Sequence, residues 1–253
     1  MLLKNNMSLV NIVIPARNEE EVIVKTLKDL ENKLNVPFRI FVVNDKSTDN
    51  TEKVVRNYIK RHKKVSIVNN STGTSGFGKA LSLGFSKVKK GYVVFVMADL
   101  CDDPKTINKM FRKIEEGWDI VCGSRYMKGG KKKDNDNKFQ GFMSYLVNLT
   151  LHIFCNIPTR DTSNAFKMYR KEVLDSVTFN PESGVEESME ILGQAYFNGA
   201  KIMEVPTIWT GRKFGKSKFK ILKRTPRYWR IYKWILINKL RKMSGLKLDP
   251  FYV

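Results

Sequence analysis

The residues with the clearest capacity for chemistry are three acids, Asp99, Asp102 and Asp103, which follow the apolar run 93–97. This run is apolar at consecutive positions, which is typical of a strand buried in a parallel sheet. In open α/β sheets, ligands bind at the carboxyl ends of such strands. Carboxylate oxygens gathered there suit a hard divalent cation that carries a phosphorylated substrate. The stretch therefore predicts a cation site.

A structural explanation competes for two of these acids. Asp102 or Asp103 could cap a helix that starts near Pro104, because acids are favoured at the N-cap and proline in the first turn. We favour this explanation for Asp103. Asp99 lies too early in the sequence to cap that helix, so it is the acid that most needs a functional reason.

Three more polar segments follow apolar, β-branched runs, namely residues 15–19, 44–49 and 71–79. An acid directly after a strand, such as Asp45, can accept a hydrogen bond from a nucleobase or a ribose hydroxyl. Asp49 is better explained as a helix cap. In the third segment, backbone amides and Lys79 could face a phosphate. It is not a Walker A loop, because Ala80 replaces the Ser or Thr after the lysine although Gly73 and Gly78 have the right interval, and a dinucleotide fingerprint would follow the first strand.

Alternating strands and helices must position these segments. Strands are expected at residues 10–14, 38–43, 65–68, 92–97, 120–123 and 201–205, and helices at 19–34, 51–61, 79–89, 104–116, 184–198 and 227–243. This alternation favours right-handed crossovers and a mostly parallel sheet. The four polar segments then meet along one edge of the sheet. The fold class is therefore α/β with a ligand site at that edge.

The charge of the chain is unusual. Its 253 residues include 46 Lys and Arg against 25 Asp and Glu, a net charge of +21. Such a field favours a polyanion, either nucleic acid or an anionic membrane surface, unless a lysine-rich genome explains part of the excess. The basic residues concentrate at 128–138, expected to be a solvated loop, and at 212–242. The first seven residues are too short and too polar to be expected to act as a signal peptide. The three cysteines lack the spacing of a metal site or a disulfide, which suits a reducing compartment.

Two segments are expected to be amphipathic interfacial helices. Residues 139–159 carry no formal charge, but Ser144, Asn148, His152 and Asn156 recur every four residues as one polar stripe. A helix of this kind lies on a surface and does not cross a membrane. In the last helix, aromatic and apolar residues alternate with arginines and lysines. Membrane contact is favoured for both helices, and the alternative is burial in a groove of this protein or against a membrane-anchoring subunit.

Together these motifs resemble the inverting glycosyltransferases of family 2, with a particular likeness to dolichol-phosphate mannose synthases and other polyprenyl-phosphate sugar transferases. The order and spacing agree from about residue 8 to residue 220. The matching segments are Ile12-Val13-Ile14-Pro15 with Asn18-Glu19, Val43-Asn44-Asp45 with Ser47-Thr48-Asp49, Gly76-Phe77-Gly78-Lys79, Ala98-Asp99-Leu100, Gly123-Ser124-Arg125-Tyr126, Asp161-Thr162-Ser163-Asn164-Ala165-Phe166-Lys167, Glu204-Val205-Pro206, and Arg212 with Gly215, Ser217 and Lys218.

The resemblance implies a GT-A nucleotide-sugar-binding fold over residues 1–220, followed by a basic aromatic C-terminal helix at 221–253 that meets the membrane. It also implies roles for individual residues. Asp99, helped by Asp102, would hold Mg²⁺ or Mn²⁺ on the donor diphosphate, Arg212 would close over it, and Arg125 would meet the lipid phosphate, so that Asp99, Arg125 and Arg212 are the catalytic candidates. The donor-binding candidates are Pro15, Ala16, Arg17, Glu19, Asp45, Lys79, Asp99 and Lys218.

The activity implied is inverting transfer of mannose or glucose from GDP-mannose or UDP-glucose to a polyprenyl or dolichyl phosphate, by a peripheral enzyme on the cytoplasmic face of a membrane. A phosphate monoester is already ionised near neutral pH and needs no strong general base. A sugar acceptor, as in polysaccharide or glycan synthesis, would need one, and Glu186, Glu187 and Glu190 are the candidates. A basic nucleic-acid-binding protein is disfavoured, because acids at the strand ends would repel phosphate.

Some positions depart from the family pattern. Met97 stands where the family's Asp-x-Asp motif has its first acid, which leaves the cation dependent on Asp99. Arg17 stands where a tyrosine is expected. Gln140 replaces a basic residue before the amphipathic helix, whereas Ser144 keeps its place.

Overall fold

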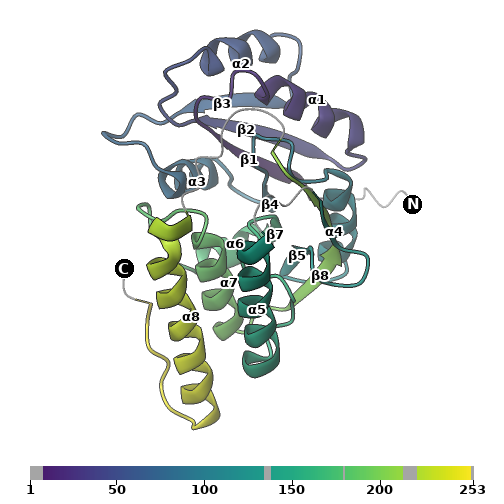
Figure 1. Ribbon diagram of the computed structural model, residues 1–253. Helices are drawn as coiled ribbons and strands as arrows, with labels where there is room; N and C mark the ends of the chain where they lie inside the picture. The colour runs from purple at the N-terminus through teal and green to yellow at the C-terminus, as the bar shows by residue number, and fades with distance from the viewer. Residues whose placement is uncertain (1–7, 134–137, 179, 213–220, 252–253) are drawn as a thin grey trace, which may run out of the picture.

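A seven-stranded sheet lies between two layers of helices in the computed structural model, which describes residues 8–133, 138–178, 180–212 and 221–251, with backbone alone for 138–140 and 221–223 (Figure 1). The strand order is β3-β2-β1-β4-β7-β5-β8. The strands are β1 (Val10–Ala16), β2 (Phe38–Asn44), β3 (Val65–Asn69), β4 (Tyr92–Phe95), β5 (Ile120–Ser124), β7 (Lys167–Arg170) and β8 (Ile202–Pro206).

The sheet is mostly parallel, as the alternation of strands and helices predicts. Only β7 runs antiparallel, to both β4 and β5. The sequence pattern missed β7 because the strand is four residues long and has a basic residue at each end. It completes the sheet between β4 and β5, so the predicted α/β class is confirmed with one antiparallel strand inserted.

Helices cover both faces of the sheet. The first face carries α1 (Ile23–Lys33), α2 (Thr51–Ile59) and α4 (Lys105–Glu115), and the second carries α3 (Phe77–Ser86), α5 (Lys138–Cys155), α6 (Lys171–Asp175), α7 (Glu187–Phe197) and α8 (Ile221–Met243). In Figure 1, α5, α7 and α8 run side by side, and α8 packs against both α5 and α7.

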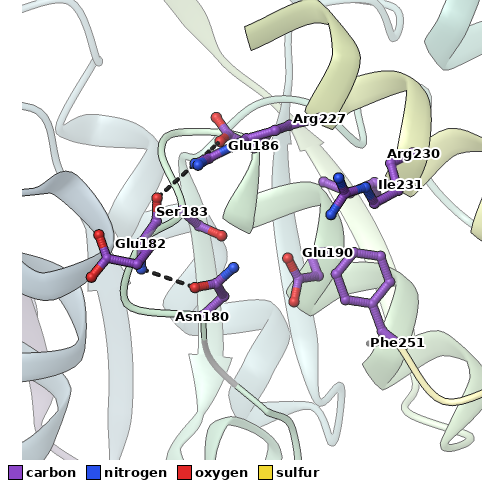
Figure 2. Close-up of a pocket in the computed structure, with 9 residues that line it drawn as sticks. All are labelled: Asn180, Glu182, Ser183, Glu186, Glu190, Arg227, Arg230, Ile231 and Phe251. Carbon is purple, nitrogen blue, oxygen red and sulfur yellow. Dashed lines mark hydrogen bonds and ion pairs between the residues drawn. The ribbon is translucent and has the colours of Figure 1, made fainter. Parts of the chain in front are cut away.

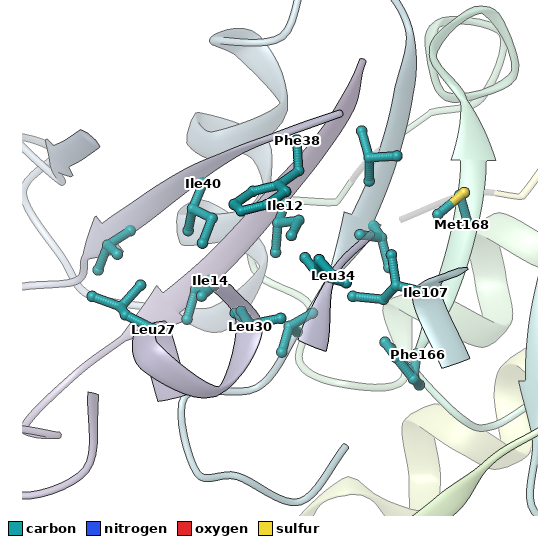
Figure 3. Packing of buried hydrophobic residues seen from close by; sticks show 14 of the residues in the cluster. Ile12, Ile14, Leu27, Leu30, Leu34, Phe38, Ile40, Ile107, Phe166 and Met168 are labelled. Carbon is teal, nitrogen blue, oxygen red and sulfur yellow. The ribbon is translucent and has the colours of Figure 1, made fainter. Parts of the chain in front are cut away.

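Each strand contributes to two apolar clusters because its side chains alternate between the faces. On β1, Ile12 and Ile14 join the cluster beneath α1, α2 and α4, where Leu27 and Ile107 also lie (Figure 3). Val13 joins the cluster on the other face. All five of these side chains are fully buried. Burial on both faces explains why the central strands read as continuous apolar runs.

Several boundaries differ from the sequence expectations, and three of them affect the candidate site or the last helix. Strand β4 ends at Phe95, two residues early, so the chain leaves the sheet before Met97. Helix α1 starts at Ile23 because Glu19 and Glu20 lie in a turn bonded to the turn after β2. Helix α8 starts at Ile221, which places Pro226 inside the helix instead of in its first turn.

The expected solvated loop at 128–138 is wrong for its central residues. Lys131–Lys133 form β6, which pairs in parallel with β9 (Ile208–Thr210) as a separate two-stranded sheet. The Lys131 amide donates to the carbonyl of Thr207, and the Gly211 amide donates to the carbonyl of Lys133. These backbone hydrogen bonds hold the lysines in a strand despite their mutual repulsion, and residues 134–137 lie outside the described part of the chain.

Helices α5 and α8 expose an apolar surface. Its residues are Phe142, Met143, Tyr145, Leu146, Ile153 and Phe154 on α5, and Trp229, Ile237, Leu240 and Met243 on α8. The polar stripe of α5 faces the protein instead, because Asn148 is fully buried and His152 Nδ1 lies 2.8 Å from the carbonyl oxygen of Ile157. Within the described residues, no helix is both long and apolar enough to cross a membrane.

Candidate functional site

The turns after β1, β2 and β4 share an unusual backbone feature. Each contains one non-glycine residue with a left-handed conformation, at φ values of 52° for Asn18, 54° for Lys46 and 62° for Leu100. This region costs free energy for a side chain with a Cβ, more for leucine than for asparagine. The three strands are neighbours in the sheet, so three such turns meet at one edge. Strain concentrated there marks this edge as the candidate site.

Hydrogen bonds join the first two turns. Asn18 Oδ1 accepts from the Thr48 amide at 2.8 Å, and the Glu19 amide donates to Thr51 Oγ1 at 2.8 Å. Asp49 accepts from the amide of Thr51, the first residue of α2, although the N-cap position itself is Asn50. These bonds fix the end of β1, where Pro15, Ala16 and Arg17 lie, against the turn that carries Asp45. Arg17 is exposed and Ala16 is buried.

Asp45 is buried after the end of β2, and each of its carboxylate oxygens accepts one hydrogen bond. Oδ1 accepts from Asn70 Nδ2 at 2.6 Å, and Oδ2 accepts from the Gly76 amide at 2.9 Å. The carboxylate thus connects its own turn to the glycine-rich segment. It is held in one orientation, and a nucleotide could use only its remaining lone pairs.

The glycine-rich segment serves close packing. The Gly78 amide donates to the carbonyl of Ser183 at 3.0 Å, and a Cβ at Gly78 would lie 2.9 Å from the carbonyls of Asn180, Pro181 and Ser183. Lys79 Nζ forms an ion pair with Glu182 at 2.7 Å. The lysine expected to face a phosphate would therefore have to leave Glu182 to do so.

Asp99 and Glu19 share one arginine from the far end of the chain. Arg212 Nη2 lies 3.1 Å from Asp99 Oδ2, and its Nη1 donates to Glu19 Oε2 at 3.1 Å. Both acids are less than a tenth exposed, so the guanidinium balances charges that burial would otherwise penalise. The predicted catalytic pair Asp99 and Arg212 therefore meets in space, with the predicted donor-binding Glu19.

Asp102 lies next to Asp99, half-buried. Burial, followed by the charge of Asp99, raises the pKa of Asp102 to about 7. The Met97 amide points at its carboxylate, at 3.4 Å, so position 97 lies on the Asp102 side of the site. Asp103 instead accepts from the Lys105 amide at 3.1 Å, which agrees with the cap explanation.

The two acids fit a cation that binds together with a substrate. No group of three or more His, Cys, Asp or Glu side chains in the described residues could hold a metal alone. Mg²⁺, however, is commonly held by one or two carboxylates, with substrate phosphates and water as its other ligands. After burial, the charge of Asp99 contributes to the raised pKa of Asp102, and a divalent cation would relieve this repulsion between the two acids.

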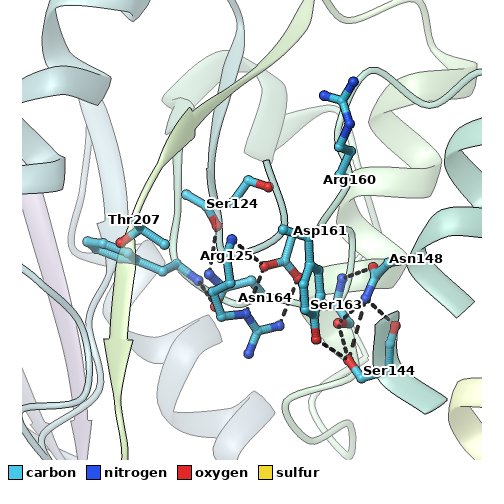
Figure 4. A network of polar contacts seen from close by, with 12 residues as sticks. Ser124, Arg125, Ser144, Asn148, Arg160, Asp161, Ser163, Asn164 and Thr207 are labelled. Carbon is cyan, nitrogen blue, oxygen red and sulfur yellow. Dashed lines mark hydrogen bonds and ion pairs between the residues drawn. The ribbon is translucent and has the colours of Figure 1, made fainter. Parts of the chain in front are cut away.

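Arg125, at the end of β5, is held by Asp161. Its Nε and Nη2 donate to the two carboxylate oxygens at 2.7 and 2.8 Å, and its backbone amide donates at 2.9 Å (Figure 4). Asp161 is fully buried, and its charge raises the pKa of Arg125 against the effect of burial. Arg125 and Asp102 also interact electrostatically, so this arginine lies on the Asp102 side of the site.

A network of polar side chains continues from Arg125 to α5 (Figure 4). Tyr126 donates to Ser144 Oγ at 3.2 Å, and Asn148 Nδ2 donates to Ser163 Oγ at 2.9 Å. Thr162 Oγ1 donates to Asn148 Oδ1 at 2.5 Å. The polar stripe of α5 therefore anchors the loop that carries Asp161, which orients Arg125.

The three glutamates considered as general bases lie on or next to α7. A cavity of about 260 Å³ between α7 and α8 is lined by Glu186, Glu190, Arg227 and Phe251, among others (Figure 2). Glu186 pairs with Arg224 and Arg227 of α8. Burial, followed by Glu186, raises the pKa of Glu190 to about 7.

Glu187 is fully buried beside them, and neither of its carboxylate oxygens has a hydrogen-bond partner among the residues described. Burial and the neighbouring glutamates raise its pKa to about 9, so it is neutral at pH 7.

Sequence reasoning included Asp161 in a matching segment without giving it a partner, and it gave no role to Glu182 or Lys132. Asp161 and Glu182 pair with the predicted residues Arg125 and Lys79, and neither position carries a local signal for that pairing. Lys132 on β6 is half-buried near Arg125. The only available signal for it was its place in a basic run. Lys218 lies in 213–220, outside the described residues.

Comparisons with known proteins find related sequences. The sequence model of glycosyl transferase family 2 matches residues 11–178. The chain is 30% identical over 253 residues to a dolichol-phosphate mannosyltransferase of Pyrococcus furiosus, covering 96% of this chain and 70% of the relative. It is 24% identical over 240 residues to a polyprenol monophosphomannose synthase of Mycolicibacterium smegmatis, covering 93% and 90%.

Solved structures share the fold at lower identity. Glucosyl-3-phosphoglycerate synthase from Mycobacterium tuberculosis, in complex with Mn²⁺, UDP and glucosyl-3-phosphoglycerate, superposes with a TM-score of 0.64 at 17% identity, covering 95% of this chain and 81% of that one. S. aureus TarS 1-349 in complex with UDP-GlcNAc superposes with a TM-score of 0.65 at 21% identity, covering 93% and 73%. Both likenesses show the GT-A type of fold.

Proposed function

Since the chain belongs to glycosyl transferase family 2 and is a glycosyltransferase, we propose that it transfers mannose or glucose from GDP-mannose or UDP-glucose to a polyprenyl or dolichyl phosphate, with inversion. One observation carries the proposal. Arg125, a strong phosphate ligand, is fixed by Asp161 and interacts with Asp102, which in turn interacts with Asp99. A phosphate acceptor would thus lie next to the acids that suit a donor diphosphate and its cation. Two relatives named for dolichol or polyprenol phosphate products support this acceptor.

On the donor side, Pro15, Ala16, Arg17, Glu19 and Asp45 form the wall for the nucleotide. Asp99 and Asp102 would hold Mg²⁺ or Mn²⁺, and a structural neighbour that contains Mn²⁺ with UDP supports a divalent cation. That cation would neutralise charge that develops on the departing diphosphate.

Arg212 and Arg125 have different roles in the transfer, one on the leaving diphosphate and the other on the attacking phosphate. An oxygen of the acceptor phosphate attacks C1 of the sugar while the bond from C1 to the diphosphate oxygen breaks, so the configuration at C1 inverts. Arg212 leaves Asp99 and Glu19 and donates to the leaving diphosphate, with Lys218 and Lys79 as further cations. Arg125 orients the attacking phosphate. No general base is required, because a phosphate monoester is largely ionised above pH 6.

The α5–α8 surface would bring the protein to the lipid acceptor. Its apolar side chains point outward, and α8 adds exposed cations such as Arg230 and Lys233. We assign this surface, including the C-terminal segment 221–253, to peripheral contact with the anionic cytoplasmic face of a membrane. Burial against a membrane-anchoring subunit is the competing assignment.

Liposome flotation tests the membrane assignment. Phe154→Asp should reduce flotation with anionic vesicles, whereas Lys60→Asp on the opposite layer should leave it nearly unchanged. Binding to DNA that exceeded binding to such vesicles over a salt series would favour a nucleic-acid partner instead.

The activity test uses the purified chain with GDP-mannose or UDP-glucose, each with Mg²⁺ or Mn²⁺, and a short polyprenyl phosphate. We expect a glycosylated lipid phosphate with one donor, none without the divalent cation, and none with the free polyprenol. If no nucleotide sugar is transferred to any isoprenoid phosphate, the proposed acceptor class is wrong.

A sugar acceptor is the second candidate, and Glu190 is the observation in its favour. A carboxylate with a pKa of about 7 that lines a cavity is suited to general base catalysis. Under this alternative, Glu190→Gln should abolish transfer to a sugar hydroxyl. Under the phosphate-acceptor proposal, the same variant should keep most of its activity.

A further inference from the structure

We propose that Lys132 and Arg125 together bind the phosphate monoester of the acceptor, with Lys132 supplying the positive charge that this site would otherwise lack. The substrate class rests on the function proposed above. Lys132 itself is inferred from its place in β6, its surroundings and the charge balance around Arg125.

The strand geometry turns Lys132 alone toward the site. Side chains of a strand alternate between its two sides. Accordingly, Lys131 and Lys133 are exposed and Lys132 is half-buried. In the register between β6 and β9, Lys132 pairs with Trp209, and its Nζ lies 5.4 Å from the centre of that ring. The indole therefore fixes the direction of the lysine by a cation–π contact.

Close backbone packing brings the start of β6 against Arg125. A Cβ at Gly130 would lie 2.4 Å from the carbonyl oxygen of Ser124 and 2.9 Å from that of Arg125. Only glycine allows this approach without displacement. The approach is why a lysine two residues later interacts electrostatically with both Arg125 and Asp161.

The cations near Arg125 favour binding of an anion. Arg125 and Asp161 form a bidentate pair whose charges cancel. Lys132 adds a positive charge beside this pair, and Asp102 is the other acid that interacts with Arg125. Among the described residues, its ammonium has a cation–π contact but no hydrogen-bond or ion-pair partner. Burial, followed by the charge of Arg125, lowers the pKa of Lys132. A phosphate monoester, with a charge near −2 at neutral pH, would pair with both cations.

The two-stranded sheet of β6 and β9 also connects the proposed phosphate site to Asp102. Trp209, which contacts Lys132, also forms a β-bridge with Asp102, and the Thr210 amide donates to the carbonyl of Cys101 at 2.9 Å. Two residues further along is Arg212. A phosphate held by Lys132 and Arg125 would lie on the Asp102 side of the donor site, from which it could attack the sugar.

The chain offers a matched control for the test, because Lys133→Met removes the same charge from the same strand on its exposed side. Wild type, Lys132→Met, Lys132→Arg and Lys133→Met are assayed with the donor, Mn²⁺ and citronellyl phosphate. Loss of one charge-assisted hydrogen bond should raise the KM for citronellyl phosphate about 10- to 100-fold in Lys132→Met. The KM for the donor, the slow hydrolysis of the donor and the Tm should not change. Lys132→Arg should recover most of the affinity, and Lys133→Met should stay within about twofold of wild type.

The outcomes separate the two proposals. If wild type transfers to citronellyl phosphate but Lys132→Met behaves like Lys133→Met, the assignment of Lys132 is wrong and the proposed function stands. If wild type transfers only to a sugar hydroxyl, the proposed function fails and the phosphate site fails with it. If wild type instead uses 3-phosphoglycerate and loses that activity in Lys132→Met, the phosphate site is supported and its occupant is a soluble monoester.

Discussion

Arg212 gives the sharpest prediction, because its removal should change cation binding and catalysis in opposite directions. Without donor, its guanidinium forms ion pairs with Asp99 and Glu19. A divalent cation that binds Asp99 must first displace this guanidinium or tolerate its charge. Arg212→Ala should therefore bind Mn²⁺ more tightly than wild type in the absence of donor, while it transfers sugar more slowly.

The magnitude follows from the contacts. A hydrogen bond between charged groups contributes about 1.5–3 kcal/mol, and Arg212 is largely shielded from solvent, with 17% of its side chain exposed. Since about 1.4 kcal/mol corresponds to a factor of ten, Mn²⁺ affinity should increase about 10- to 100-fold. Catalysis loses the cation that the leaving diphosphate requires, and the rate should fall by about 10²–10³.

Calorimetric titration of Mn²⁺ into donor-free protein provides the measurement, and single-turnover transfer provides the rate. Arg56→Ala is the matched control, because Arg56 also forms an ion pair, with Glu52 on exposed α2. It should change neither quantity. Mn²⁺ affinity that is unchanged or weaker in Arg212→Ala, in a protein with the wild-type Tm, would show that the cation does not bind at Asp99.

Three further predictions concern buried charge. Met97→Asp places a third carboxylate beside Asp99 and Asp102 and should strengthen Mn²⁺ binding to the donor-free protein in the same titration. Unchanged affinity would show that the cation does not bind at this edge of the sheet. Glu187→Gln removes a group whose pKa rises from 4.5 to about 9 on folding. The protonated carboxyl fits the native state and the carboxylate does not, so the free energy of unfolding of the wild type falls as pH rises from 4.5 to 9, by about 3 kcal/mol at pH 7. Measured by urea unfolding, the stability of the variant relative to wild type should therefore increase over this pH range, and a constant difference would contradict the buried position. Asp161→Asn leaves Arg125 without its charged partner and should cost about 3–5 kcal/mol in urea unfolding, a cost that a solvent-exposed pair would not show.

The strand-end segments could be predicted from sequence because each follows from local pattern. A continuous apolar run locates a buried strand, and the residue after it must lie at the carboxyl edge of the sheet. Asp45 and Asp99 were found in this way. The cap role of Asp103 was also predictable, because a cap acts on an amide two residues away.

The partners of these residues could not be predicted in the same way. Glu19 and Arg212 are separated by 193 positions, and Arg125 and Asp161 by 36. No periodicity links positions that meet only after the sheet has formed. Lys79 shows the consequence, because its glycine-rich context suggests phosphate binding while Glu182, from a distant loop, neutralises it.

The arrangement of α5 shows a further limit of pattern reading. The spacing of its polar residues predicts an amphipathic helix, but not which face meets the protein. In an ordinary surface helix the apolar face is buried. Helix α5 buries Leu151 and Cys155 in this way, but it also buries Asn148 and leaves Phe154 66% exposed. The buried polar residue has a cause in the site, because Asn148 and Ser144 hold the loop that positions Asp161. Orienting Arg125 thus places part of the polar stripe against the protein, and apolar side chains on the other side of the helix remain exposed.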